Sequence, residues 1–525
     1  MTINHWFIFF LAVQVIHFLG TWKLYQAAGR KAWEAAIPVY NSIVLMKIIS
    51  RPTWWTLLLF IPIINLIMFP VVWVETLRTF GKKSTADTLL GIFTLGFYVY
   101  YVNYTQKLEY HADRKLTSEN KAADTLSSLL FAIIVATLVH TYVVQPFTIP
   151  TSSLEKSLLI GDFLFVSKVN YGPRTPMTTV ALPMVHDTIP FVKIKSYTSW
   201  PQLPYFRLPA LEKIKNNDIV VFNWPTDTAY NMYIRPDKNY YKPIDKKTNY
   251  VKRCVGIPGD NLEIKDGIVF INEKELILPE RAKPQYSYAV ALDGKTGIDF
   301  ESLVKRLDIT DGGYFKDNEK RDTLVFSALT QTSVDVIKNT PGVTGIKKII
   351  NKGAEDGIFP DYQDGKASVT NNWNCDNMGP IYIPKAGATV SLTKENLPLY
   401  KAIITNYEGH TLAVNGTQIL IDDKPVTNYT FAKNYYWMMG DNRHNSLDAR
   451  YFGYTPEDHI VGKPVFIWMS WDTNGKGINK IRWDRVFTTV SGEGQPQSYF
   501  KYFLMLLAAY FVGEFFWRKR KENKA

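Results

Sequence analysis

Long apolar segments lie toward both ends of this chain and leave a polar middle between them. About 20 apolar residues are enough for a helix to cross the ~30 Å hydrocarbon core of a bilayer. A chain of this kind must therefore fold partly in a membrane and partly in water. The runs that are nearly free of charge are 5–22, 54–77, 88–104, 126–144 and 499–517.

The distribution of basic residues predicts how these segments are oriented. Lys and Arg gather in 106–124 and in the tail after Trp517, and such clusters favour the cytoplasmic side of a membrane. Run 126–144 then exits the cytoplasm, and run 499–517 returns to it. The N-terminal runs do not obey the rule, because simple alternation would place Lys82 and Lys83 outside. Either one of the runs 54–77 and 88–104 is re-entrant, or the rule fails there.

The formal net charge of +12 is spread through the chain and comes with no nucleic-acid recognition motif. We therefore expect no nucleic-acid partner, and we expect membrane lipid to face the basic tail. The two cysteines, Cys254 and Cys375, follow no metal or haem spacing. They could form one disulfide, or remain a buried strand thiol and a loop thiol.

The polar middle has the pattern of short antiparallel strands. β-Branched and aromatic residues fill 162–168, 217–224 and 465–471, and hairpin turns appear as Asp-Gly in 261–272 and Asn-Gly in 411–421. The expected fold class is mainly β and antiparallel, with an inserted α/β lobe and several transmembrane helices.

The inserted lobe differs from its surroundings by its alternation of helix and strand patterns. Phe300–Leu307 has helical periodicity, and 323–329 has the composition of a strand. The lobe contains no catalytic constellation. The expected organisation is a membrane module of about three apolar segments over 1–104, a cytoplasmic linker over 105–125, an anchor over 126–144, a β domain over 145–285 and 396–490, the lobe over 286–395, a C-terminal helix over 499–517 and a basic cytoplasmic tail over 518–525.

Three hydroxyl residues follow the anchor. Pro146 and Pro150 forbid a continuing helix and force extended backbone, after which come Thr151, Ser152 and Ser153. Taken alone, such a cluster is a solvated turn. A nucleophilic serine would also need a base that accepts its proton.

Lys252 is a candidate for that base. Strand alternation places Tyr250, Lys252 and Cys254 on one face, and Arg253 on the other, outward face. A lysine buried among apolar residues loses its proton more easily than one in water. The alternative interpretation is a lysine at the rim of a strand.

The segment Gly440-Asp-Asn-Arg-His-Asn-Ser-Leu-Asp-Ala-Arg450 is dense in turn-forming and charged residues. It could be only a hydrogen-bonded loop. It could also support the site, with a serine donating to the lysine and Asp448 paired with Arg443 or Arg450. His444 makes a Ser-His pair conceivable as well.

Together these segments resemble type I signal peptidases, the membrane-bound Ser-Lys proteases that remove signal peptides. Phe147-Thr-Ile-Pro-Thr-Ser-Ser-Leu154 is similar to the family's nucleophile motif, and Tyr250-Val-Lys-Arg-Cys-Val-Gly-Ile-Pro-Gly-Asp260 to its lysine motif. Asn217-Asp-Ile-Val-Val-Phe222 and the 440–450 segment fit two further motifs. The similarity covers about 145–282 and 395–475. It does not cover the lobe or the N-terminal module.

The resemblance implies Ser153 as nucleophile and Lys252 as general base. It implies that Ser446 holds the lysine amine, that Thr151 and the Ser153 backbone N–H hold the oxyanion, and that Asp448 and Arg450 are structural. Thr151 stands where the family commonly has serine. The resemblance further implies apolar pockets for small substrate residues, lined by Phe147, Ile149, Leu154, Leu158, Tyr250 and Val251.

The same resemblance implies an endopeptidase that acts through an acyl-enzyme and needs no metal or other cofactor. Its partners would be signal peptides of exported pre-proteins, with the export machinery as a further candidate. Its place would be the bacterial plasma membrane, with the catalytic domain outside the cytoplasm. Two alternatives are a self-cleaving Ser-Lys repressor-type peptidase and a catalytically inactive membrane scaffold. The membrane segments disfavour the first, and the intact Ser153, Lys252 and Ser446 disfavour the second.

Overall fold

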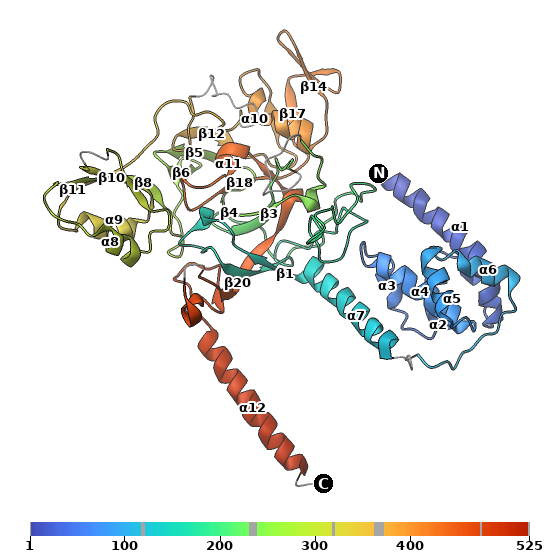
Figure 1. The fold of residues 1–525 in the computed structure, drawn as a ribbon. Coiled ribbons are helices and arrows are strands. Elements are labelled where there is room, and N and C mark those ends of the chain that lie inside the picture. Colours follow the sequence, from blue (N-terminus) through green and yellow to red (C-terminus); the bar gives the residue numbers. More distant parts are fainter. Residues whose placement is uncertain are drawn as a thin grey trace. The chain divides into compact units, whose positions relative to one another are not determined.

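The computed structural model describes residues 2–116, 121–229, 239–317, 321–361, 372–472 and 475–522. The chain forms two compact units, shown as ribbons in Figure 1. One unit comprises Met1–Val143, Pro173–Leu208 and Thr228–Lys247, and the other comprises Val144–Gly172, Pro209–Asp227 and Thr248–Ala525.

The first unit is helical over its N-terminal part. Thr2 caps its first helix by accepting a hydrogen bond from the backbone N–H of His5. Leu24, Met46 and Val72 belong to one apolar cluster that joins the helices. The helices are α1 (Ile3–Ala27), α2 (Tyr40–Ile48), α3 (Trp55–Leu58), α4 (Asn65–Thr79), α5 (Thr85–Phe93), α6 (Tyr98–Thr105) and α7 (Lys121–Leu138).

Three helices of the described chain are long and apolar enough to cross a membrane: Ile3–Ala27, Ala123–Val143 and Phe500–Glu522, the last being α12. The runs 54–77 and 88–104 form only shorter helices. Each run is broken where the backbone takes positive φ, at Ile63 in the first and at Leu95 in the second. A residue in that conformation cannot continue a right-handed helix.

The anchor leads directly into the sheet of the second unit. Helix α7 ends in a π-turn, Val139–Val143, and strand β1 (Val144–Thr148) begins at the next residue. Pro146 lies inside β1, which is at the edge of the sheet formed by the described residues and pairs with β2. An edge strand tolerates proline because one side of its backbone needs no partner.

The main sheet of the second unit is antiparallel throughout. Its strand order is β1-β2-β20-β3-β4-β18-β19, and β21 pairs with β20. Strand β4 is therefore central, between β3 and β18. The strands are β2 (Asp162–Ser167), β3 (Ile219–Asn223), β4 (Asn249–Gly256), β18 (Tyr435–Met439), β19 (Thr455–Pro456), β20 (Ile460–Ser470) and β21 (Thr488–Thr489).

A second, separate antiparallel sheet begins at Asn261, soon after β4 ends at Gly256. It has the order β12-β5-β6-β7, and β5 and β6 form a hairpin with Asp266 and Gly267 at the turn, both at positive φ. Two small sheets and short helical segments complete the described part of this region. The elements are β5 (Asn261–Lys265), β6 (Ile268–Ile271), β7 (Lys274–Glu275), β12 (Met378–Tyr382), β13 (Thr389–Ser391), α10 (Leu397–Ala402), a π-turn (Ile403–Tyr407), β14 (Leu412–Asn415), β15 (Gln418–Ile421), β16 (Lys424–Val426), β17 (Asn428–Thr430) and α11 (Ala449–Phe452).

The inserted lobe is a four-stranded antiparallel sheet with two helices on one side of it (Figure 1). Its order is β11-β8-β10-β9, and Val290, Leu303, Phe326 and Ile337 belong to a separate apolar core. The elements are β8 (Tyr286–Leu292), α8 (Phe300–Arg306), β9 (Gly313–Phe315), β10 (Thr323–Leu329), α9 (Gln331–Lys338) and β11 (Val343–Lys348).

The expected fold class is confirmed: antiparallel β sheets, an α/β lobe within them, and candidate membrane helices. Both predicted hairpins are present, as β5–β6 and β14–β15. The predicted strand 323–329 is β10, and the helix expected over 300–307 is α8.

Candidate functional site

The turn that carries Ser153 follows the edge strand β1. After β1 the chain stays paired, since the backbone of Ile149 bonds to both Gly161 and Asp162. A 3-10 turn, Ser152–Leu154, comes next. Leu154 is 1% exposed and anchors this turn in an apolar cluster, while Ser153 itself is 7% exposed. The packing thus fixes the position of the Ser153 hydroxyl.

Lys252 reaches that hydroxyl from the central strand β4, where it pairs with Val220. Its Nζ donates a hydrogen bond of 2.6 Å to Oγ of Ser153. The lysine is only 4% exposed. Burial lowers its pKa to about 8, while the negative charge of Asp448 opposes this shift. A serine hydroxyl and an amine that is easily deprotonated therefore touch each other away from bulk water.

The 440–450 segment packs against the backbone of Ser153 at Gly440. A Cβ at this position would lie 2.5 Å from the carbonyl oxygen of Ser153 and 2.2 Å from Oγ of Ser446. Only glycine allows that approach. The backbone N–H of Gly440 donates to a carboxylate oxygen of Asp448 at 3.0 Å, which fixes the start of the loop.

Arg253 is not outward, contrary to the interpretation of the alternation. It is 2% exposed and forms a two-pronged ion pair with Asp441, with bonds of 2.8 and 2.6 Å. Burial would raise the pKa of Asp441, but the Arg253 charge outweighs it and keeps that pKa below its usual value. Asp441 also accepts a hydrogen bond from Ser157, which lies in the turn that carries Ser153 (residues 152–157). The pair therefore joins β4, the 440–450 loop and that turn.

Asp448 pairs with Arg450 rather than with Arg443. The two bonds between their side chains measure 2.9 and 2.8 Å, and both residues are at most 1% exposed. Arg450 also donates to the carbonyl oxygens of Arg443 and Cys375. Asp448 and Arg450 therefore bond to each other and to buried backbone groups, and these bonds hold the 440–450 loop in place.

The two other hydroxyl residues predicted for the site differ in their exposure to solvent: Ser446 is buried and Thr151 is exposed. Ser446 Oγ is buried and has no hydrogen-bond partner in the part of the chain that the structure describes, so no bond holds the lysine amine there. Thr151 is exposed, and its hydroxyl does not cap the 3-10 turn.

Five of the six predicted apolar lining residues belong to one cluster near Ser153. Three are almost fully buried: Ile149, Leu154 and Leu158. Phe147 and Val251 are half-buried at its edge. Tyr250 belongs to another core, where it stacks on Trp224 with ring centroids 5.1 Å apart.

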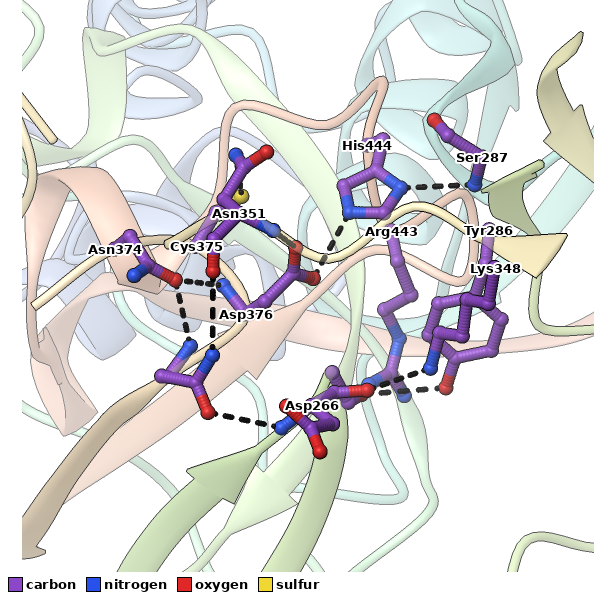
Figure 2. A network of polar contacts seen from close by, with 12 residues as sticks. Asp266, Tyr286, Ser287, Lys348, Asn351, Asn374, Cys375, Asp376, Arg443 and His444 are labelled. Carbon is purple, nitrogen blue, oxygen red and sulfur yellow. Dashed lines mark hydrogen bonds and ion pairs between the residues drawn. The ribbon is translucent and has the colours of Figure 1, made fainter. Parts of the chain in front are cut away.

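His444 does not pair with Ser153. Its Nδ1 accepts the backbone N–H of Ser287 at 2.9 Å, and its Nε2 lies 2.9 Å from Oδ1 of Asp376 (Figure 2). A ring nitrogen that accepts an N–H carries no proton, so the ring proton is on Nε2 and is donated to Asp376. His444 therefore links the lobe to the chain before β12.

Cys375, Asp376 and His444 also offer three ligand atoms within 4.8 Å of one another. The hydrogen bonds disfavour a metal at this place, because protonated Nε2 has no lone pair to give. Burial raises the pKa of the Cys375 thiol to about 12, which keeps it protonated. Cys375 and Cys254 are both free, buried thiols.

Two features of the site had no sequence prediction. One is the Arg253–Asp441 pair. The other is Asn442, whose backbone N–H donates to the Ser153 carbonyl at 3.1 Å and whose amide donates to the Ser152 carbonyl at 3.3 Å. Their positions in the motifs could have pointed to them: Arg253 directly follows Lys252, and Asp441 and Asn442 directly follow Gly440.

Comparison with known families agrees with this geometry. The family described as signal peptidase, peptidase S26 matches residues 122–339 and 391–471, which is more than half of the chain. Residues 33–113 match a family described only as one of unknown function.

Individual relatives point the same way. The signal peptidase I of Buchnera aphidicola subsp. Acyrthosiphon pisum is 25% identical over 382 residues, covering 71% of this chain and 85% of that protein. That of Buchnera aphidicola subsp. Baizongia pistaciae is 23% identical over 367 residues, covering 70% and 83%. That of Rickettsia canadensis is 28% identical over 164 residues, covering 31% and 48%. The chain is a serine peptidase with candidate membrane helices, and it belongs to the signal peptidase family, peptidase S26.

Proposed function

We propose that this protein is a membrane-bound endopeptidase that removes N-terminal signal peptides from exported pre-proteins with a Ser153–Lys252 dyad. The 2.6 Å bond between Lys252 Nζ and Ser153 Oγ carries the proposal, because both groups are buried. Membership of the signal peptidase family supplies the substrate class.

The first half of the reaction forms an acyl-enzyme. Neutral Lys252 takes the proton of Ser153 while Oγ attacks the scissile carbonyl carbon. The Ser153 backbone N–H and the Thr151 hydroxyl stabilise the oxyanion, which suits the exposed position of Thr151. The Lys252 ammonium then gives its proton to the departing amine, which is the new N-terminus of the mature protein.

The second half releases the signal peptide. Lys252, neutral again, takes a proton from a water molecule, and the resulting hydroxide attacks the ester carbonyl. The ammonium returns that proton to Ser153 Oγ as the ester bond breaks. Ser446 is proposed to hold the amine during these transfers, since its buried hydroxyl has no partner among the described residues in the free enzyme.

The signal peptide is proposed to bind as an extended strand at a sheet edge. Phe147 and Val251 stand half-buried at the edge of the apolar cluster and would contact small side chains before the cleavage point. Ile149, Leu154 and Leu158 form the wall behind them. The pockets proposed at this cluster are shallow and accept small side chains.

We place the protein in the bacterial plasma membrane with the β domain outside the cytoplasm. Lys107 and Arg114 precede α7, and Arg518–Lys521 follows the apolar part of α12, so both basic segments favour the inner side. A protease added to intact spheroplasts should digest the β domain and spare the tail, and protection of the β domain would refute this orientation.

The test of the dyad is cleavage of a purified pre-protein with an Ala-x-Ala site in detergent. Ser153→Ala and Lys252→Ala should each abolish cleavage. Ser152→Ala removes the neighbouring hydroxyl but leaves the Ser153–Lys252 pair intact, so it should keep measurable cleavage where the two dyad variants keep none. Wild-type cleavage by Ser153→Ala or by Lys252→Ala would overturn the assignment. Inactive enzyme of every form, wild type included, would favour the scaffold alternative.

A further inference from the structure

The loop that follows helix α8 of the inserted lobe lies against the nucleophile turn. Asp308, at its start, forms an ion pair with Lys156, three residues after Ser153. Ile309 is 8% exposed and belongs to the apolar core of the lobe, so the loop is fixed from behind. Asp311 ends this segment with a half-buried carboxylate.

Asp311 is joined to the nucleophile turn through two asparagine amides. One carboxylate oxygen accepts from Nδ2 of Asn442 at 2.9 Å and from Nδ2 of Asn445 at 3.1 Å. The remaining N–H groups go to Ser152: Asn442 donates to its carbonyl at 3.3 Å, and Asn445 to its hydroxyl at 3.1 Å.

The orientation of the Asn442 amide depends on Asp311. A flipped amide would point its oxygen at the carboxylate and at the Ser152 carbonyl, which would be repulsive. Asn442 is fully buried, and its backbone N–H also donates to the Ser153 carbonyl. Asp311 therefore selects the amide orientation that satisfies the carbonyl preceding the nucleophile.

We propose that Asp311 is a positioning residue for Ser153, and that the inserted lobe thereby holds the nucleophile in place. This inference rests on the proposed function, and it gives the lobe a task in the same reaction. Without Asp311 the two amides lose the acceptor that aligns them, and the carbonyl and hydroxyl of Ser152, directly before Ser153, lose their fixed donors. Since the network does not contact Lys252, it governs the placement of Oγ rather than the basicity of the amine.

The test measures kcat and KM of detergent-solubilised full-length variants on a pre-protein. Asp311→Ala should lower kcat about ten- to a hundredfold, the range for an attacking atom that is misplaced by a fraction of an ångström up to 1 Å. KM and the pH midpoint of kcat/KM should stay near wild type. Asp311→Asn keeps an oxygen acceptor and should recover most of the loss. Glu301→Ala removes an exposed acid from helix α8 and serves as the matched control with unchanged kinetics.

A second variant keeps the inference testable if Asp311→Ala fails to fold. Asn445 is exposed, so Asn445→Ala should fold, and it should lower kcat in the same direction. Where the double variant folds, it should be no slower than the slower single variant, because both changes break one chain of bonds. Additive losses, or a loss in Asp311→Ala that Asp311→Asn does not recover, would overturn the inference.

Two outcomes separate this inference from the proposed function. A wild-type kcat for Asp311→Ala beside an inactive Ser153→Ala would overturn the positioning role and leave the dyad standing. Cleavage by Ser153→Ala would overturn the dyad and the positioning role together. A change in KM alone would assign Asp311 to substrate binding and also refute the inference.

Discussion

The pH dependence of cleavage follows from the position of Lys252. The proposed mechanism needs the neutral form of Lys252, and burial lowers the pKa of this residue from the ordinary 10.5 to about 8. With that pKa the neutral fraction rises from ~0.1 at pH 7 to ~0.9 at pH 9. We therefore expect kcat/KM to rise about tenfold over this interval and then to level off. A lysine of ordinary pKa would give about a hundredfold rise over the same interval and no plateau.

The lowered pKa of Lys252 also makes the free energy of unfolding depend on pH. The unfolded chain keeps a proton on this lysine up to about pH 10.5, whereas the folded protein releases it near pH 8. Burying the charged lysine therefore costs ~3 kcal/mol at pH 7, and stability rises with pH between these two values. Lys252→Met removes the charge and should raise the melting temperature at pH 7, with a smaller gain at pH 10.

The assay is initial-rate cleavage of a pre-protein at sub-saturating concentration from pH 6 to pH 10, in buffers of constant ionic strength. A control incubation at each pH, assayed afterwards at pH 8, separates titration from inactivation. A profile that is flat from pH 6 to pH 9 would refute the role of Lys252 as base. A rise that continues beyond pH 10 would refute the effect of burial.

Three further changes test the surroundings of the dyad. Gly440→Ala should lower kcat by more than about a hundredfold, because its Cβ would lie 2.5 Å from the Ser153 carbonyl oxygen, and wild-type kcat would show that the loop does not pack this way. Ser446→Ala should lower kcat/KM without lowering the melting temperature, since an unpartnered buried hydroxyl costs about 1–3 kcal/mol, and a marked drop in that temperature would contradict this. Glu155 is 3% exposed and burial raises its pKa from 4.5 to about 7, so its contribution to stability is full below pH 4.5 and is lost as the pH rises through 7. Glu155→Gln should therefore stabilise the protein by up to ~3 kcal/mol at pH 8 and little at pH 4.5, and equal melting shifts at both pH values would count against that cause.

Local sequence rules predicted much of this fold. Pro146 and Pro150 placed extended backbone before the hydroxyl cluster, and Asp266-Gly267 placed a hairpin turn. These features depend on the backbone preferences of a few adjacent residues. Alternation along β4 correctly put Lys252 and Arg253 on opposite faces. It failed for the burial of Arg253, because only the sheet order shows that β4 is central, between β3 and β18.

The links between distant segments were beyond such rules. Nothing in the sequence near Asp311 indicates that its carboxylate meets Asn442 and Asn445 more than a hundred residues later. The break at Leu95 was equally hidden, because leucine seldom adopts positive φ, whereas the break at Ile63 had a signal in the adjacent Pro62.

The two buried acids that raise the pKa of Lys252 are each paired with an arginine. Asp441 is paired with Arg253, and Asp448 with Arg450. Either carboxylate without its arginine would favour the ammonium form of Lys252, since both already raise its pKa against the effect of burial. The Arg450 charge offsets part of that rise. Arg450 therefore does more than brace the loop, because its charge lowers the pKa of Lys252 against the effect of the two acids. Desolvation remains the largest influence on this pKa, and it makes a neutral amine available near pH 8.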